Sequence, residues 1–166
     1  MTEQELKKHL DAAEKNPEAV AREVTGLKRK VLDYKPSPDK WSIQEIVCHL
    51  ADAEIVFAHR MRQALADNEP TFSPIDQDAW AKQLGYDEAT AAEMLALYAL
   101  LRRSNLRLLR RIGIADLEKS GFHPERKSKV TLGELVEYLA KHGPNHLEQI
   151  VRLKAQAEPA GKMKVH

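Results

Sequence analysis

Apolar residues recur at intervals of three and four along four long segments, and this spacing constrains the fold more than any other feature of the sequence. It predicts helices over about residues 3–32, 42–67, 87–112 and 131–155. No segment shows the alternation that is typical of a strand, and we find no internal repeat. Four amphipathic helices with long second and third connections predict an all-α fold, a four-helix bundle.

Capping signals mark the starts of two of these helices. Ser42 is followed three residues later by Glu45, and Thr131 is followed by Glu134, which is the capping-box pattern. Within the first helix we expect a joint at Pro17, because proline suits the first turn of a renewed helix. The starts of the second and fourth helices are therefore better defined than the course of the first.

The connections differ in length. Residues 34–41 (YKPSPDKW) form a proline-rich turn, whereas residues 68–86 (NEPTFSPIDQDAWAKQLGY) form a long loop rich in turn-forming residues. A loop of this length is uncommon in a compact domain and often covers a functional site. We therefore expect residues 68–86 to cover a site on the bundle.

The length of 166 residues suits one domain with a single core, which we assign to residues 1–156. Residues 157–166 are expected to form a disordered tail, because they combine proline, glycine and lysine at a terminus. No apolar run reaches the ~20 residues that span a bilayer, and the N-terminal segment lacks a signal-peptide core. The single cysteine, Cys48, fits a reducing compartment, so we expect a cytoplasmic protein with no membrane partner.

The formal net charge of +1 provides no global field that would attract nucleic acid. A local excess of positive charge lies in the third helix, which carries Arg102, Arg103, Arg107, Arg110 and Arg111. Two interpretations stay open, a solvated helix face and a surface that binds an anionic substrate. No aromatic residues interleave with these arginines to stack bases, which disfavours nucleic acid as a partner.

Three of the seven histidines are placed to face the interior of the bundle. His142 and His146 are four residues apart, so they lie roughly 40° apart on one helix. His146 falls within the apolar stripe of the last helix, and His142 falls at its edge. His49 lies on the rim of the apolar face of the second helix, from which it can face the last helix. The other histidines are expected to be surface residues: His9, His59, His123 and His166.

Both a metal site and ordinary buried imidazoles are compatible with this trio. A buried neutral imidazole can be satisfied by hydrogen bonds alone. Three imidazoles suit Zn²⁺, Ni²⁺, Fe²⁺ or Co²⁺, and they leave a coordination position for water or substrate. Cys48 lies about 100° round the helix from His49, so we expect it to pack as a small hydrophobe and not to serve as a fourth ligand.

The sequence around His49 resembles the second-helix signature of the DinB/YfiT-like superfamily. The resembling segment is KWSIQEIVCHLADAEIVFAHR, residues 40–60. The HLEQI segment (146–150) and Asp78-Ala79-Trp80 are also similar to segments of that family, and the resemblance covers about residues 20–155. It implies a four-helix bundle with a histidine triad, and the positions that match the triad are His49, His142 and His146.

The same resemblance implies a divalent metal ion, with zinc or nickel as the usual candidates. It also implies thiol-transfer chemistry, in which relatives use low-molecular-weight thiols such as bacillithiol or mycothiol as S-transferases or isomerases. Other members of the family are regarded as metal-dependent hydrolases.

Three hypotheses of function result. The first is a metal-dependent thiol S-transferase, in which Arg60 or the basic third helix holds a carboxylate of the thiol. The second is a metal-dependent hydrolase, for which Asp52 and Glu45, each about one turn from His49, are candidate general bases. The third is a non-enzymatic, stress-related metal-binding protein. An enzyme of either kind implies a small-molecule substrate, and a homodimer is compatible with all three hypotheses.

Gly143-Pro144 interrupts the last helix between two of the histidines. Glycine and proline are the least favourable residues in a helix interior, and Pro144 cannot donate a hydrogen bond to the carbonyl of Ala140. One interpretation is that Gly143 permits close approach of a neighbouring helix while Pro144 faces solvent. The other is that the pair kinks the helix and re-aims His142 relative to His146.

Overall fold

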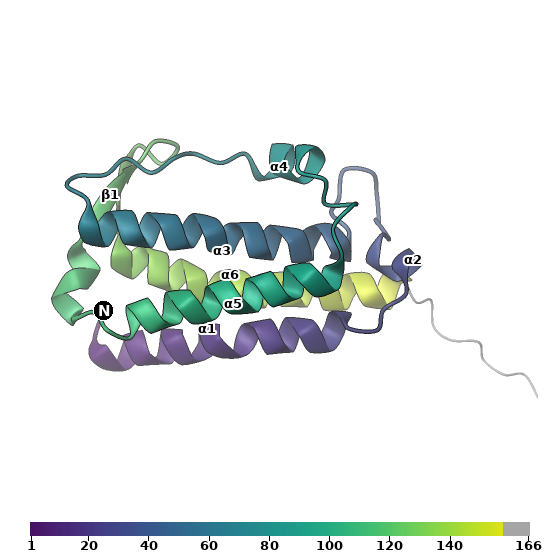
Figure 1. The fold of residues 1–166 in the computed structure, drawn as a ribbon, viewed down its shortest axis with the longest axis horizontal. Coiled ribbons are helices and arrows are strands. Elements are labelled where there is room, and N and C mark those ends of the chain that lie inside the picture. Colours follow the sequence, from purple (N-terminus) through teal and green to yellow (C-terminus); the bar gives the residue numbers. More distant parts are fainter. Residues whose placement is uncertain (158–166) are drawn as a thin grey trace, which may run out of the picture.

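The computed structural model describes residues 1–157, and four long helices make up most of it (Figure 1). They are α1 (Glu3–Val24), α3 (Ile43–Ala66), α5 (Ala91–Leu109) and α6 (Leu132–Ala157). The connections contain two short helices, α2 (Arg29–Leu32) and α4 (Gln77–Gln83), a 3-10 helix η1 (Ile114–Glu118), and the strands β1 (Ser120–His123) and β2 (Ser128–Thr131). The prediction of a four-helix bundle is confirmed.

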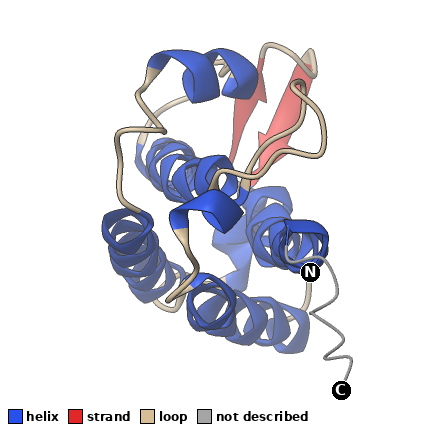
Figure 2. Cartoon of the chain, turned by 90° about the vertical axis from the view of Figure 1, so that its right-hand side faces the viewer, coloured by secondary structure: helices blue, strands red, loops and turns tan. Residues whose placement is uncertain are grey.

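The helices are not arranged in chain order around the bundle. Each of α1 and α3 packs against both α5 and α6. The consecutive long helices α1 and α3 therefore occupy opposite corners, as the end-on view shows (Figure 2). Apolar residues of all four helices fill the interior, and examples that are at most 2% exposed are Val20, Ile46, Leu106 and Leu139.

The first helix differs from the predicted segment of residues 3–32. It ends before Gly26, whose φ of +81° separates α1 from α2. The expected joint at Pro17 is not found, since α1 runs through this residue. Proline leaves the carbonyl of Ala13 without its helical partner, and Arg102 Nη1 donates to that oxygen at 2.8 Å. A side chain from another helix thus compensates for the missing backbone bond.

The predicted capping boxes at the starts of α3 and α6 are present. Ser42 Oγ accepts a hydrogen bond from Glu45 N at 3.2 Å, and Glu45 Oε2 accepts one from Ser42 N at 2.7 Å. Thr131 and Glu134 make the same pair of bonds. Both helices therefore begin within one residue of the predicted position, which fixes the faces that carry the histidines.

The prediction that the chain contains no strand is wrong, because β1 and β2 pair as an antiparallel hairpin. The hairpin also pairs with the long loop: Phe72 N donates to Phe122 O at 2.9 Å, and Phe122 N donates to Pro70 O at 2.8 Å. At Gly121, a Cβ atom would lie 2.4 Å from the Phe72 ring, so only glycine fits there. Strands of four residues are too short to show a clear alternation in the sequence.

The arginines of the predicted third helix do not share one environment. Arg102 is 1% exposed, which contradicts a surface role for it. Its Nε donates to Glu54 Oε1 at 2.7 Å, and Asn105 Nδ2 donates to Glu54 Oε2 at 2.8 Å. Arg102 Nη2 donates to Tyr98 Oη at 3.0 Å, and Tyr98 donates to Asn16 Oδ1 at 2.6 Å. We call these five residues the buried polar network. The remaining four arginines are exposed: Arg103, Arg107, Arg110 and Arg111.

The helix α5 is shorter than the predicted segment of residues 87–112. Thr90 Oγ1 accepts a hydrogen bond from Glu93 N at 3.2 Å, so a capping box sets the start of this helix as well. The turn that follows Leu109 leads into η1.

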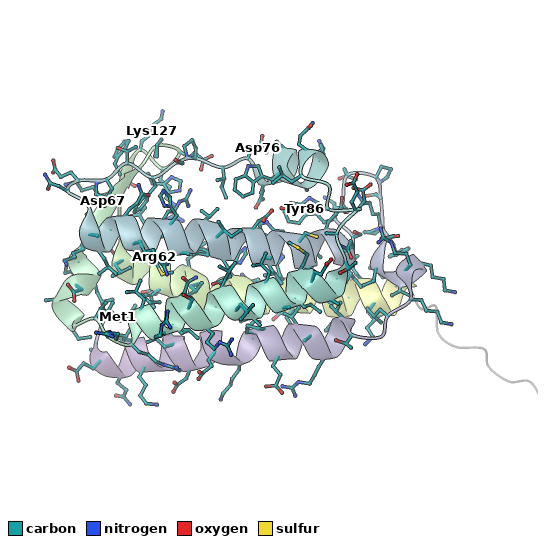
Figure 3. All side chains as sticks on the ribbon, in the orientation of Figure 1. Met1, Arg62, Asp67, Asp76, Tyr86 and Lys127 are labelled. Carbon is teal, nitrogen blue, oxygen red and sulfur yellow. The ribbon has the colours of Figure 1, made fainter. Side chains whose placement is uncertain are left out.

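A layer of chain lies over α3, and we call it the cover. It consists of residues 68–86, which include α4, and residues 120–131, which form the hairpin (Figure 1). Figure 3 places Asp76 and Tyr86 on this layer and Lys127 at the hairpin turn. Tyr86 Oη donates to Asp52 Oδ2 at 2.5 Å, which ties the cover to α3. Further contacts to α3 come from α4 and β1.

Among residues 1–157, no helix combines the length and the apolar character that crossing a bilayer requires. Of the predicted disordered tail, residues 158–166 lie outside the described part of the chain, and His166 lies there too.

Candidate metal centre

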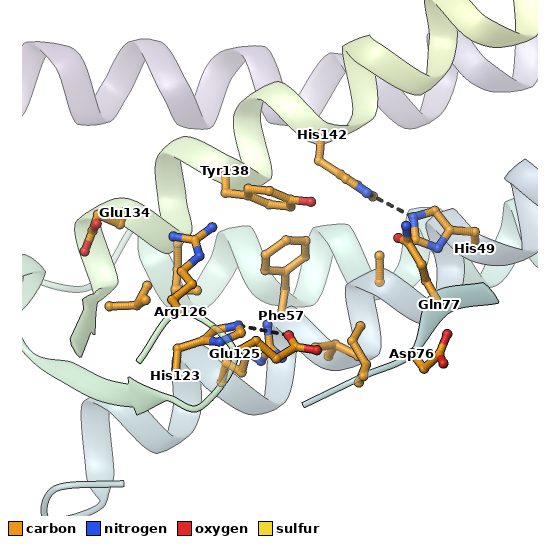
Figure 4. Close-up of a pocket in the computed structure, with 16 residues that line it drawn as sticks. His49, Phe57, Asp76, Gln77, His123, Glu125, Arg126, Glu134, Tyr138 and His142 are labelled. Carbon is orange, nitrogen blue, oxygen red and sulfur yellow. Dashed lines mark hydrogen bonds and ion pairs between the residues drawn. The ribbon is translucent and has the colours of Figure 1, made fainter. Parts of the chain in front are cut away.

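The structure brings together the three histidines that the sequence analysis singled out, between α3 and α6. His49, His142 and His146 each offer one ring nitrogen within 4.8 Å of the other two. The Nε2 atoms of His49 and His142 are 3.1 Å apart, as the dashed line in Figure 4 shows. The ring centroids of the three pairs lie between 4.6 Å and 5.1 Å apart.

All three imidazoles are neutral at pH 7. Burial, with a smaller contribution from the neighbouring His146, lowers the pKa of His49 to about 3 and the pKa of His142 to about 2. Burial also lowers the pKa of His146, although a hydrogen bond to Gln149 acts in the opposite direction. Neutral imidazole is the form that coordinates a metal ion. At pH 7 the three rings therefore do not have to lose a proton from a charged form before a metal ion binds.

Neighbouring side chains fix the orientation of the rings. His146 Nδ1 lies 3.1 Å from Gln149 Oε1. Because an amide oxygen only accepts, Nδ1 carries the hydrogen, and Nε2 presents its lone pair to the cluster. The Trp41 ring packs at 4.7 Å from the His49 ring and stacks at 6.4 Å on His146, measured between centroids. The donor nitrogens of His49 and His146 are therefore held in place by packing and by a hydrogen bond.

Gly143 is the point of contact between the buried polar network and α6. A Cβ atom at Gly143 would lie 2.2 Å from Asn16 Oδ1 and 2.9 Å from Tyr98 Oη. The interpretation that Gly143 permits close approach is therefore confirmed. α6 is continuous through Gly143 and Pro144, and Pro144 is partly buried instead of facing solvent freely. The network thus contacts α6 one residue away from His142.

A cavity of about 530 Å³ lies beside the histidine cluster (Figure 4). His49 and His142 form one end of it, and Phe57 and Tyr138, with ring centroids 5.2 Å apart, form its middle. Tyr138 also stacks on His142 at 5.3 Å. The cover provides the opposite wall with residues from the long loop and from the hairpin. The prediction that residues 68–86 cover a site agrees with this arrangement.

The other candidate residues lie in different places. Glu45 belongs to the cap of α3 and pairs with Lys35 at 2.6 Å, and Asp52 accepts the hydrogen bond of Tyr86. Neither carboxylate lines the cavity. The geometry therefore gives no support to either as a general base. Arg60, in contrast, lines the cavity and is 9% exposed.

Cavity residues that the sequence analysis missed come mainly from the cover. The prediction that His123 is a surface residue is wrong: it is 7% exposed and lines the cavity, where β1 places it. Asp76, the N-cap of α4, lines the same cavity. Gln149 could have been found from the sequence, because it lies three residues after His146 on the same helix face.

The donor set is suited to a divalent transition-metal ion. Three neutral nitrogen donors are typical of sites for zinc, nickel, iron or cobalt that keep a coordination position open. Cys48 is not part of the cluster. Its Sγ lies 3.6 Å from the carbonyl oxygen of Tyr86, and burial raises the pKa of its thiol to about 11. This environment agrees with its predicted role as a small buried side chain.

Comparisons with known proteins agree with this fold, and the names of relatives refer to metal dependence. Residues 12–150 match the family model described as the DinB superfamily. Two relatives are each named a "putative metal-dependent hydrolase". One, from Oceanobacillus iheyensis, is 28% identical over 82% of this chain and 78% of its own. The other, from Bacillus mycoides, is 27% identical over 93% of this chain and 88% of its own.

A solved structure has the same fold. The chain is similar to YfiT from Bacillus subtilis with a TM-score of 0.89 and 23% sequence identity, over 94% of this chain and 89% of that one. YfiT is described as "a probable metal-dependent hydrolase with an unusual four-helix bundle topology".

Proposed function

Because this chain belongs to the DinB superfamily, we propose that it is a metal-dependent enzyme in which His49, His142 and His146 bind a divalent ion. The observation that carries this proposal is a cluster of three neutral imidazoles, two of which, His49 and His142, form one end of a cavity of about 530 Å³. The cavity is of a size that takes a small molecule. The names of the metal-dependent relatives support the same conclusion. Zinc and nickel are the ions to test first.

A bound divalent ion supplies Lewis acidity, which lowers the pKa of a coordinated water or thiol to near neutrality. The chain's own residues orient the histidine rings and line the cavity. Gln149 orients His146, and Trp41 packs against His49. The rings of Phe57 and Tyr138 line the cavity beyond the cluster and give it an apolar wall.

A low-molecular-weight thiol is our first candidate for the attacking group. A thiol has an ordinary pKa of about 8.5, far below the ~15.7 of bulk water, so it has less need of a general base. This lower need for a base agrees with the lining of the cavity, which contains neither of the candidate general bases, Glu45 and Asp52. In the transfer, the thiol sulfur bonds to an electrophilic carbon of the second substrate. The leaving group departs with the bonding electrons, and the thiol proton passes to solvent.

Hydrolysis is the second candidate, and Asp76 is the observation that favours it. Asp76 is exposed to the cavity, and Figure 4 shows it with Gln77 on the side nearest His49. Its Oδ1 accepts hydrogen bonds from Asp78 N and Ala79 N, so Oδ2 is free to accept a proton from an attacking water.

The first test is metal content. Protein purified without added metal and without a polyhistidine tag should contain about one ion per chain by mass spectrometry, and His49→Ala should lose it. Absence of metal from the unaltered chain would contradict the proposal.

The second test separates the two reactions. Metal-loaded protein is assayed with monochlorobimane and a panel of cellular thiols, and in parallel with ester, amide and lactone substrates, with and without chelator. Conjugation that chelator abolishes supports the thiol transferase, and substrate cleavage that Asp76→Asn abolishes supports the hydrolase. If neither occurs and His49→Ala lowers thermal stability together with metal binding, the metal has a structural role.

A further inference from the structure

The end of the cavity away from the histidines contains a buried guanidinium that is poorly paired. Arg60 is 9% exposed, and its one hydrogen bond among the described residues is from Nη2 to Ser73 O at 2.8 Å. Its Nε is buried and has no partner in this part of the chain. Burial lowers the pKa of Arg60, which reflects the cost of keeping this charge away from water. A buried charge normally has a counter-ion or a full set of hydrogen bonds.

Two further nitrogen-bearing side chains of the hairpin, His123 and Arg126, line the cavity on the side away from His49 (Figure 4), and both interact electrostatically with Arg60. His123 is 7% exposed, and its Nδ1 is buried without a hydrogen-bond partner among residues 1–157. Its Nε2 lies 4.0 Å from Glu125 Oε2, too far for a good hydrogen bond. Arg126 is exposed and lines the same cavity. Arg60, His123 and Arg126 together form what we call the basic end of the cavity.

Three carboxylates also line the cavity, and two of them already have partners. Glu134 Oε2 accepts a hydrogen bond from Thr131 N at 2.7 Å, and Asp76 Oδ1 accepts bonds from the first turn of α4. Glu125 is exposed and is the remaining counter-charge near the basic end. The Arg60 guanidinium therefore keeps unused donors in spite of these acidic neighbours.

The cavity is elongated along α3. The residues His49, Ala53, Phe57 and Arg60 all line it, and they recur at helical spacing on one face of α3. At about 1.5 Å per residue, the eleven steps from His49 to Arg60 span roughly 16 Å of helix axis. Between the two ends the lining is mostly apolar, with Phe57 and Tyr138 in contact. The cavity thus offers a histidine end, an apolar middle and a basic end in a row.

From this arrangement we propose that the basic end binds a carboxylate of an elongated substrate whose reacting group lies at the histidines. This inference rests on the proposed function and adds the class of substrate: an amphiphilic molecule with an apolar middle and a terminal anion. The planar guanidinium of Arg60 suits a carboxylate, which accepts two N–H bonds at once. His123 and Arg126 would add further donors from the hairpin.

The test uses pairs of probes that differ only in the terminal group. Zinc-loaded protein is titrated by calorimetry with ω-mercaptooctanoate and with ω-mercaptooctanol. The carboxylate should bind about tenfold or more tightly than the alcohol, since a charge-assisted hydrogen bond distinguishes them. Mercaptopropionate should show no such advantage over mercaptopropanol, because a short chain cannot reach from the histidines to Arg60.

Substitutions test which residues cause the tighter binding of the long carboxylate probe. Arg60→Met should remove the advantage of the long carboxylate, and Arg126→Met, at an exposed position, should reduce it. Glu125→Gln should increase it, because a nearby negative charge is removed. The matched control is Arg62→Met, which changes an exposed arginine on the same helix that does not line this cavity. The control should leave the advantage unchanged.

The possible failures are distinguishable. If zinc binds but the long acid and alcohol have equal affinity, or if the advantage survives both Arg60→Met and Arg126→Met, the inference is overturned and the proposed function stands. If the chain binds neither zinc nor nickel, the proposed function fails. The basic end is then tested alone, by whether octanoate raises the melting temperature of the metal-free protein more than octanol does and whether Arg126→Met reduces that difference; no difference between octanoate and octanol would overturn the inference.

Discussion

At the scale of single residues, Gly143 lies where the packed interior of the bundle meets the histidine cluster. It permits the contact between α6 and the buried polar network, and it directly follows His142. The glycine is therefore required by the close approach of Asn16, in spite of the low helix propensity of glycine.

We expect Gly143→Ala to lower the free energy of unfolding by about 1–3 kcal/mol, because its Cβ would overlap Asn16 Oδ1. This cost outweighs the gain of about 1 kcal/mol that alanine brings to a helix. Urea denaturation measures the change. In an Asn16→Ala background the same substitution should cost less. An equal cost in both backgrounds would show that the overlap is not the cause.

Gln149 is the residue that holds His146 in the tautomer with its lone pair on Nε2. We expect Gln149→Leu to weaken metal binding by about 10–100-fold, which is typical of second partners of ligating histidines. Competition with a chromophoric chelator measures the affinity. Gln156→Leu, an exposed position on the same helix, is the matched control. If both variants bind metal alike, Gln149 has no part in orienting the ligand.

Sequence patterns identify some residues of the candidate site but not others, and the reason is physical. His49, His142 and His146 lie on long amphipathic helices, and helix periodicity fixes which way each side chain points. His123 and Asp76 lie on the cover, where direction depends on pairing between segments distant in the chain. No local pattern encodes that pairing.

At the scale of the elements, boundaries could be predicted where a local side chain sets them. The capping boxes gave the starts of α3 and α6 within one residue. The course of α1 could not be predicted, because the carbonyl that Pro17 leaves free is satisfied by Arg102 of α5. The hairpin was missed because its strands are short and are held by contacts with Phe72 and the long loop.

In the buried polar network, Arg102 of α5 donates hydrogen bonds to Glu54 of α3 and to the carbonyl oxygen of Ala13 in α1. The packing of these three helices therefore depends on this one arginine. We expect Arg102→Met to cost about 3–5 kcal/mol of unfolding free energy, because it leaves the Glu54 carboxylate buried without its partner. The double variant with Glu54→Leu should cost less than the sum of the two single changes. Arg103→Met, at the exposed neighbouring position, should change little. Urea denaturation compares them, and equal losses for Arg102→Met and Arg103→Met would contradict this role.

At the scale of the whole molecule, the two buried histidines His49 and His142 couple stability to pH. In the folded protein the pKa values of His49 and His142 lie well below the ordinary value of 6.5, so only the unfolded chain takes up protons there between about pH 6.5 and 4. Stability contributed by the neutral rings is therefore full above pH 6.5 and falls as the pH is lowered. Each ring contributes up to about 1.4 kcal/mol per pH unit to this slope.

Denaturation of the metal-free protein in the presence of chelator, from pH 8 to pH 4.5, measures the effect. We expect the double variant His49→Asn with His142→Asn to show a shallower loss of stability below pH 6.5 than the unaltered chain. His59→Asn, at an exposed position, should keep the original slope. Identical slopes in all three proteins would show that these rings take up protons alike in the folded and in the unfolded chain.

The cover and the bundle meet at the cavity but are built by different parts of the chain. The histidines lie on α3 and α6, whose register is set by capping and core packing, while the facing wall comes from residues 68–86 and 120–131. A loop tolerates insertions and deletions far better than a packed helix. In evolution, the proposed metal ligands on α3 and α6 can therefore stay the same while the facing wall of the cavity changes in length and composition.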